Sequence, residues 1–537
     1  MKRLVLLLAV VLACNLTVSA DDEGHHHEDL TKEQLGAVHF PISCVTGVQQ
    51  PFERGVALLH SFWYEEAEKQ FAQIAQDDPH CAMAHWGVAM SLWHQLWNHP
   101  DAKMIKKGQA EVKKAKALHS RDDRERGYIA AMDAFYGGQK ERDYQSRAEA
   151  YAKAMEAASQ RHPEDREAAV FYGLSLLASA PDRDTTFANQ KKAAAVLEKV
   201  FAEAPDHPGV AHYLIHSYDS PQMAQLGLPA ARRYAKIAPA APHALHMPAH
   251  IFARLGLWQD DIDSNLASIA ATRKTAAMHM GGEGHQFHAM DFLEYAYLQS
   301  GHEADAQRLM DEIKAMPSMK DARYGNFDPH LSALVTFPAR YALELHHWSD
   351  AAALTPVPGA DAGDSAITYW ARAIGAARSG NAAQAHKEAA EIEPLHKTLL
   401  NRKRAYMAEF VEREYQEAEA WATYAEGKHD EALKTLRAIA EKEEAEGDEP
   451  LAIPAREMLA DMLMEMNQPS QALTEYEADL KFNPNRFNGL YGAAHSAELA
   501  DKHDQANTYY AQLIKVCDGA KSDRPELSRA RSLLAQK

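Results

Sequence analysis

Two pairs of histidines in the middle of the chain have the spacing of a metal site. His212 and His216 are four residues apart, and so are His246 and His250. Residues four positions apart share one face of a helix, and two imidazoles placed in this way are a familiar means of holding zinc. The second pair follows the first at an offset of 34 residues. The sequence therefore predicts two equivalent helices that present their histidines side by side.

Two further histidines, His243 and His288, fall at matched positions one turn earlier on neighbouring helices. Packed helices lie about 8–10 Å apart, so imidazoles from neighbours can meet at one ion. Three parallel helices span too much for every side chain to reach the same ion, so we expect three or four to ligate and the rest to surround them. The predicted metal ligands are His212, His216, His243, His246, His250 and His288.

A catalytic role is a hypothesis built on the same alignment of helices. Asp291, Tyr295 and Arg340 continue the rows that the histidines begin. If a metal-bound water attacks a carbonyl or phosphoryl group, Asp291 or a spare histidine would move protons, and Tyr295 and Arg340 would orient an anionic substrate. The outer positions of such a site could be filled by Asp219, Glu283, His285 and Glu294.

The identity of the ion stays open at this point. Imidazole with carboxylate suits zinc, iron, nickel or copper(II), and zinc is the divalent metal that we favour. Methionines close in sequence to these histidines, such as Met278 and Met280, make copper(I) a further possibility, although methionine in a repeat protein commonly packs in the core. Two interpretations without metal also fit: a polar ligand or catalytic site, and structural packing in a chain that has 29 histidines.

The elements that must position these side chains have the pattern of helical hairpins. Residues 54–79 form two amphipathic stretches, with Ala67 at the close contact and Pro79 before the next helix. This stretch and the 34-residue period resemble the tetratricopeptide repeat (TPR) family, and roughly nine or ten such units cover most of the chain from Phe52 to Gln536. The resemblance implies an all-α, TPR-like superhelical solenoid whose first helices line a concave groove. The turn inside successive hairpins is expected at Gly256, Gly301, His346, Gly380, Gly427, Asn467 and Asp501.

The chain is expected to divide into five segments. These are a signal peptide (1–20), an acidic His-rich lead-in (21–51), an N-terminal TPR-like array carrying the His-rich groove (52–354), a Pro/Gly linker (355–365) and a C-terminal TPR-like array (366–537). A Gly-rich stretch, Gly281 to Gly284, lies beside the histidines and could form a mobile flap.

Export is predicted from the first twenty residues. Basic Lys2 and Arg3, an apolar run and the small residues 18–20 have the pattern of a secretory signal, which would direct the protein to a bacterial periplasm or outside the cell. A competing pattern resembles a lipobox that ends at Cys14 and would tether the protein by lipid, although Leu12 fits it poorly. No other segment looks transmembrane, and a formal net charge of −19 argues against nucleic acid or an anionic membrane surface as partner.

Three cysteines remain once the signal is removed. Cys44 and Cys81 flank the first hairpin and could form a disulfide, which export favours, with Cys517 left over. The alternative is that all three are small buried hydrophobes.

Two functions fit this sequence. The first is an exported repeat protein with a metal-binding, possibly hydrolytic site in its groove; the strip HALHMPAHIFARLG (243–256) resembles exported bacterial TPR proteins of no established activity. The second is a non-enzymatic scaffold that binds a protein or peptide ligand in the groove. The chain has no G-x-S-x-G elbow, P-loop, Rossmann glycine pattern or C-x-x-C-H haem motif. Its oligomeric state cannot be read from these patterns.

Overall fold

The computed structural model describes residues 30–97, 99–138, 142–181, 184–280, 284–317, 327–447 and 451–535. The predicted signal peptide, residues 21–29 of the lead-in, Glu283 and residues 281–283 of the expected flap lie outside these ranges.

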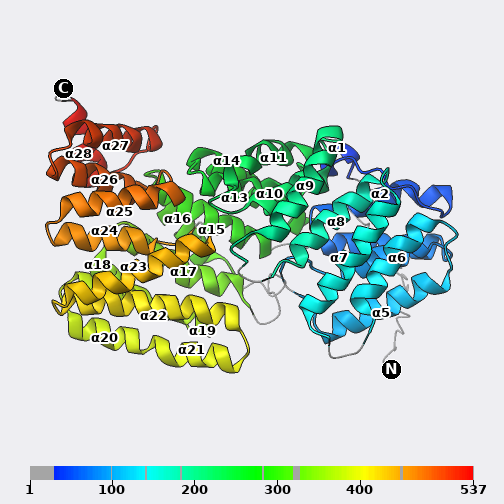
Figure 1. The fold of residues 1–537 in the computed structure, drawn as a ribbon, viewed down its shortest axis with the longest axis horizontal. Helices are drawn as coiled ribbons and strands as arrows, with labels where there is room; N and C mark the ends of the chain where they lie inside the picture. The colour runs from blue at the N-terminus through cyan, green and yellow to red at the C-terminus, as the bar shows by residue number, and fades with distance from the viewer. Residues whose placement is uncertain are drawn as a thin grey trace, which may run out of the picture.

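In these ranges the chain folds into α-helices that pack as sequential antiparallel hairpins (Figure 1), so the predicted all-α class is confirmed. Helix α3 (Tyr64–Asp77) shows the cause. Its buried residues include Ala67, Phe71 and Ile74, which recur every three or four positions and give the helix one apolar face. A Cβ on Gly87 of the next helix would lie 2.3 Å from the Phe71 ring, so glycine there allows the close approach.

The N-terminal part of the solenoid leads up to the histidine-bearing helices and includes them. Its elements are α1 (Lys32–Leu35), the 3₁₀ turn η2 (Thr46–Val48), α2 (Gln49–His60), α3 (Tyr64–Asp77), α4 (Ala82–Ser91), α5 (Ala102–Ala117), α6 (Asp123–Tyr136), α7 (Tyr144–Arg161), α8 (Arg166–Ala178), α9 (Ala188–Glu203), α10 (Pro208–Tyr218), α11 (Ala224–Ile237), α12 (Pro242–His246), α13 (Pro248–Arg254), α14 (Trp258–Ala277) and α15 (Gly284–Gln299).

The C-terminal part continues the stack of hairpins. Its elements are α16 (Glu303–Ala315), α17 (Pro329–Glu344), α18 (Trp348–Ala352), α19 (Ala362–Arg378), α20 (Ala382–Ala390), α21 (Ile392–Asn401), α22 (Ala405–Ala425), α23 (His429–Glu446), α24 (Ala455–Glu465), α25 (Pro469–Phe482), α26 (Phe487–Leu499), α27 (His503–Val516) and α28 (Pro525–Ala535).

The turns inside the hairpins share one backbone conformation. All seven predicted turn positions have positive φ, between 56° and 87°, which confirms them as turns. Glycine adopts this conformation without steric cost, and asparagine and aspartate are the side chains that tolerate it best. The residues are Gly256, Gly301, His346, Gly380, Gly427, Asn467 and Asp501.

The interior of the solenoid is apolar, and it divides into clusters along the chain. One large cluster of buried side chains runs from Leu35 to Met280, and a second runs from Ala339 to Ala530. Within the described ranges, no helix combines the length and apolarity needed to cross a bilayer.

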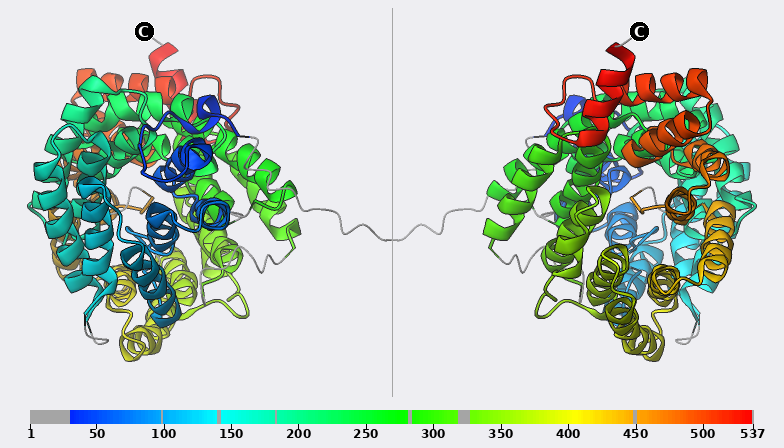
Figure 2. Two further views of the ribbon diagram at one scale, coloured as in Figure 1. Left: turned by 90° about the vertical axis from the view of Figure 1, so that its right-hand side faces the viewer. Right: turned by 90° about the vertical axis from the view of Figure 1, so that its left-hand side faces the viewer.

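The C-terminal helices return to the middle of the chain as the hairpins wind around the long axis (Figure 2). Asn485, which precedes α26, donates its side-chain amide to the carbonyl of Gly256 at 3.0 Å. The next residue, Arg486, is enclosed by protein and pairs with Glu344 and Glu457 at 2.8 Å each. A buried charge must be paired to be tolerated, so these carboxylates fix the position of the returning segment.

The segment before the first hairpin is packed against the repeats. Phe40 is fully buried, with its ring 4.8 Å from that of Tyr128 and 5.5 Å from that of Trp86. The hydroxyl of Ser43 donates to the carboxylate of Glu125 at 2.8 Å. Residues 30–51 of the predicted lead-in therefore belong to the folded body.

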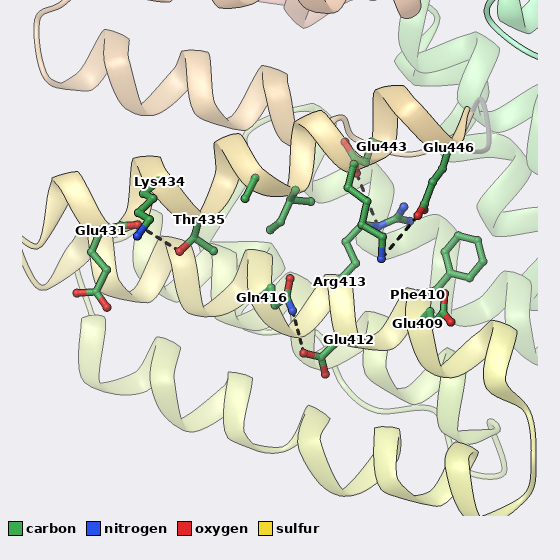
Figure 3. Close-up of a pocket in the computed structure, with 13 residues that line it drawn as sticks. Glu409, Phe410, Glu412, Arg413, Gln416, Glu431, Lys434, Thr435, Glu443 and Glu446 are labelled. Atoms are coloured by element: carbon green, nitrogen blue, oxygen red, sulfur yellow. Dashed lines mark hydrogen bonds and ion pairs between the residues drawn. The ribbon is translucent and has the colours of Figure 1, made fainter. Parts of the chain in front are cut away.

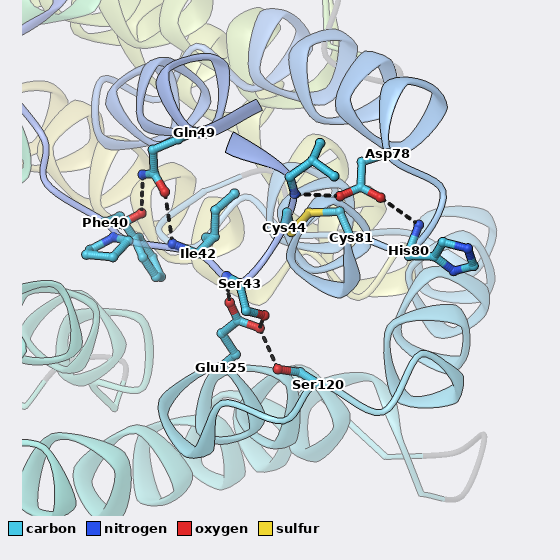
Figure 4. The surroundings of a disulfide bond; sticks show 12 residues. Phe40, Ile42, Ser43, Cys44, Gln49, Asp78, His80, Cys81, Ser120 and Glu125 are labelled. Carbon is cyan, nitrogen blue, oxygen red and sulfur yellow. Dashed lines mark hydrogen bonds between the residues drawn. A yellow bond between two sulfur atoms is a disulfide. The ribbon is translucent and has the colours of Figure 1, made fainter. Parts of the chain in front are cut away.

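A disulfide bond joins this segment to the first hairpin (Figure 4). It links Cys44 to Cys81, so of the two alternatives for these cysteines the paired one is formed. Cys517 is a buried free thiol.

Gly256→Ala should destabilise the protein more than Gly380→Ala. Both glycines have positive φ, so both substitutions incur similar backbone strain. A Cβ at position 256 would also lie 2.2 Å from the Pro484 carbonyl oxygen, whereas a Cβ at position 380 meets open space. Overpacking of this kind costs about 1–3 kcal/mol beyond the strain. Urea unfolding monitored by circular dichroism measures the difference; equal losses would contradict the contact between Gly256 and the returning segment.

Candidate metal centre

The six predicted histidine ligands gather into two groups of three. His212 and His216 of α10 meet His243 of α12, and in this first triad one nitrogen from each ring lies within 4.8 Å of the others. The second triad consists of His246, His250 and His288, with the same convergence of nitrogens. Each triad could hold a metal ion.

The repeat architecture builds both triads in the same way. A pair at i and i+4 comes from one hairpin, and the third ring comes from the first helix of the next hairpin. The short helix α12 serves both triads, because His243 faces the first and His246, three residues later, faces the second. Pro248 then begins α13, which carries His250. The 34-residue offset between the two histidine pairs thus corresponds to two triads of the same composition on successive hairpins.

In the first triad, one hydrogen bond decides which nitrogen of His212 points inward. His212 Nδ1 lies 2.6 Å from the backbone carbonyl oxygen of His60, which can only accept, so Nδ1 carries the proton. Nε2 of the neutral ring is then a bare lone pair. It lies 3.1 Å from Nε2 of His243 and 3.1 Å from Nε2 of His216. One lone pair can accept from only one of these neighbours.

The second triad is constrained more tightly, because two of its rings donate outward. His246 Nδ1 lies 2.7 Å from Oδ1 of Asn265, and the amide nitrogen of Asn265 donates to the Asp261 carbonyl, which fixes the orientation of that side chain. His250 Nδ1 lies 2.8 Å from the carboxylate of Asp219.

Both acceptors require a proton on Nδ1, so the inward nitrogens of His246 and His250 are both unprotonated in the neutral rings. These two Nε2 atoms lie 3.1 Å apart. Two lone pairs facing each other repel unless a cation lies between them. A ring whose outer N–H is held by a carboxylate, amide or carbonyl is also the usual arrangement around a metal ion.

Burial keeps several of these imidazoles in the neutral form that binds metals. It lowers the pKa of His216 to about 3 and that of His285 to about 4. It also holds the pKa values of His212 and His246 well below the ordinary value. Burial alone would raise the pKa of Asp219, but the positive charge of Arg254 and the contact with His250 outweigh it, so this carboxyl stays ionised.

A cavity of about 570 Å³ opens beside both triads. Its described lining includes His216 and His243 of the first triad and His250 and His288 of the second, together with His285. The remaining wall is largely apolar. A ligand in this cavity would therefore face both groups of histidines.

The three residues predicted to be catalytic have different surroundings. Asp291 lines the cavity, and Arg340 donates to its carboxylate at 2.8 Å. Arg340 also donates to Glu294 at 2.8 Å, so two carboxylates already surround its guanidinium. Tyr295 is buried and receives a hydrogen bond from Arg486 at 2.5 Å, outside the described lining. Of the three, the structure brings only Asp291 to the cavity.

Sequence analysis missed the parts of the site that come from distant segments. The backbone carbonyl of His60 and the amide of Asn265 hold two of the rings, and no spacing in the sequence connects them with the histidine pairs. Sequence analysis also missed Phe62. Its ring centroid lies 4.4 Å from that of His212 and 5.5 Å from that of His243, so this ring packs against the first triad.

Comparisons with known proteins give structural matches of low identity and low TM-score. Neither a protein-family model nor a curated protein matches the chain. Among solved structures, a human IFIT1 dimer with m7Gppp-AAAA aligns over 82% of this chain and 90% of its own at 15% identity and a TM-score of 0.34. The TPR domain of P58(IPK) aligns over 69% of this chain and 99% of its own (13% identity, TM-score 0.21), and the Cut9–Hcn1 hetero-tetramer of APC/C over 79% and 86% (9% identity, TM-score 0.27). The chain is a TPR-like helical repeat protein. Similarity at this level identifies no ligand.

Two other groups in this TPR-like protein bring potential metal ligands together, but both are already satisfied. Glu167 accepts from His60 at 2.9 Å and from His207 at 2.7 Å, so a carboxylate separates the two rings and no bare nitrogens face each other. Cys44 and Cys81 lie near Asp78, but their disulfide removes both thiolates.

A second large cavity, of about 620 Å³, lies between α22 and α23 (Figure 3). Figure 3 shows Arg413 directed toward Glu443 and the Gln416 amide toward Glu412, at 3.7 Å and 2.9 Å. Its described lining contains neither histidine nor cysteine. The metal hypothesis therefore concerns the cavity beside the triads.

Metal-free protein should lose stability as the pH falls below about 6.5. The unfolded chain protonates its histidines near that pH, whereas the folded chain keeps the buried rings neutral. Their contribution is thus fully present above pH 6.5 and is lost as the pH falls toward the folded pKa values. Replacing His212 and His246 with glutamine removes two such groups, so near pH 5 the slope of unfolding free energy against pH should fall by about 2.7 kcal/mol per pH unit.

Urea titrations at several pH values between 7 and 5 measure this slope. Replacing the exposed His503 with glutamine provides a control for the loss of a histidine as such. Equal slopes for wild type and the double variant would show that these rings are not held neutral.

Proposed function

We propose that this TPR-like protein binds two transition-metal ions, one in each histidine triad, and presents them to the shared cavity as a metal-dependent site for small molecules. The observation that carries the proposal is the 3.1 Å separation between Nε2 of His246 and Nε2 of His250. Their protons are held on the opposite nitrogens by Asn265 and Asp219.

A metal ion satisfies this geometry better than a shared proton does. A proton can bridge two nitrogens, but three converge in each triad. A metal ion accepts three lone pairs at once, at nitrogen distances near ~2 Å. A protonated pair would also place a positive charge among buried rings, where burial lowers the pKa of His246.

The donor set limits the choice of ion. Three imidazoles suit zinc or copper, with iron and nickel as further possibilities, and they do not suit magnesium or calcium, which prefer oxygen. Asp291, the predicted carboxylate donor, is not part of either triad. Three protein ligands leave coordination positions free, as in catalytic zinc sites. Such an ion would act as a Lewis acid and lower the pKa of bound water, so hydrolysis is one reaction that this site would support.

Export remains part of the proposal. The Cys44–Cys81 disulfide supports it, because disulfides persist mainly in oxidising compartments such as the periplasm. We propose that residues 1–20 direct the chain there.

Elemental analysis of the mature protein should find two equivalents of metal. His246→Ala/His250→Ala should retain one, because the first triad shares none of these residues. His85→Ala is the matched control: His85 also contacts a carboxylate, Glu111, at 2.7 Å, but belongs to neither triad, so two equivalents should remain. Absence of metal in the wild type after reconstitution with zinc and with copper would refute the proposal.

Asp219→Asn should weaken metal binding in the second triad by about 10–100-fold, because the carboxylate makes the His250 ring a stronger ligand. The first triad should be unaffected. Asp260→Asn controls for the loss of an ion pair, since Asp260 pairs with Arg232 at the surface and contacts no triad histidine. Competition with a chelator of known affinity measures both sites; an equal loss at both triads would exclude this role for Asp219.

A further inference from the structure

We infer that the cavity beside the triads takes a small molecule with an aromatic ring and one oxygen donor, a class of which phenols are the simplest members. The oxygen would be directed at the metal ions and the ring at the apolar wall. In placing the oxygen, the inference rests on the proposed function.

Aromatic side chains form much of the described wall. Trp97, Phe287 and Phe337 line the cavity together with Leu96 and Pro329. Flat apolar walls favour a flat apolar ligand, because aromatic rings are stabilised by stacked or edge contacts beyond the gain from their burial. A volume of about 570 Å³ lies in the usual range for small-molecule sites.

The position of Trp97 relates the wall to the histidines. Its ring centroid lies 5.8 Å from that of His216 and 5.5 Å from that of His243. These separations are those of aromatic groups in contact. A ring lying against Trp97 therefore places a substituent on its edge within reach of the first triad, where a coordination position would be free.

The protein side chains of the cavity supply no cation for a ligand oxygen. Asp291 is the one acidic residue in the described lining, and that lining holds no lysine or arginine. The guanidinium of Arg340 is already bound by Asp291 and Glu294 and does not line the cavity. Tyr295 does not line it either. An oxygen donor in the cavity would therefore be held by the metal ions and not by Tyr295 or Arg340.

Three probes of similar size separate the alternatives. They are 2-naphthol, which has an aromatic ring and an oxygen donor, naphthalene, which lacks the oxygen, and decahydro-2-naphthol, which lacks the aromatic ring. Calorimetric titration of the full mature chain, with metal content measured on the same sample, should show 2-naphthol binding at least tenfold more tightly than the other two.

Trp97→Leu should weaken 2-naphthol binding about tenfold and leave the metal content unchanged. Trp348→Leu is the matched control, because Trp348 stacks on His346 and Arg378 away from the cavity, and its substitution should not change the affinity. Equally tight binding of 2-naphthol and decahydro-2-naphthol, or an affinity for 2-naphthol that Trp97→Leu does not alter, would overturn the inference.

Failure of the proposed function would be seen separately, as a sample without metal. In that case 2-naphthol binding that Trp97→Leu weakens would still support the aromatic cavity. Its absence would overturn the cavity as well.

Discussion

The site depends on where three outer acceptors place the protons of the imidazole rings. The carbonyl of His60, the amide oxygen of Asn265 and the carboxylate of Asp219 each hold an N–H on the outward nitrogen. The inward nitrogens are then left as electron pairs directed at one another. Six histidines in a helical groove would otherwise be free to hydrogen-bond in many ways. The acceptors remove that freedom from three of the six rings, His212, His246 and His250, and so orient three nitrogen donors in advance.

The sequence predicted the fold class well, and the reason is local. Gly256 and Asn467 both have positive φ, a backbone conformation that glycine and asparagine tolerate. The residue type alone therefore predicted these turns. The histidine pairs at i and i+4 were also predictable, because they depend on the spacing of residues along one or two successive turns of the chain, which is a local property.

The grouping of the six histidines was harder to predict, since the third member of each triad crosses to the next hairpin. His243 and His288 lie one turn earlier in the alignment than the pairs they join, so rows drawn straight across the helices separate residues that the structure brings together. Asp291, which continues one of those rows, contacts Arg340 instead, and Tyr295 contacts Arg486. These contacts depend on which buried arginine lies near each side chain. That arginine can be far away in sequence, since Tyr295 and Arg486 are nearly two hundred positions apart.

The return of the C-terminal hairpins onto the middle of the chain changes the contact topology of the solenoid. An open repeat array is nearly one-dimensional: each unit touches its neighbours, and the ends can unravel one unit at a time. The bond between Asn485 and Gly256 joins residues 229 positions apart and closes this array into a loop of contacts. Fraying of the last hairpins must then break that closure, so the two ends of the loop are expected to melt together. Inserting or deleting a single repeat between them would shift the closure out of register.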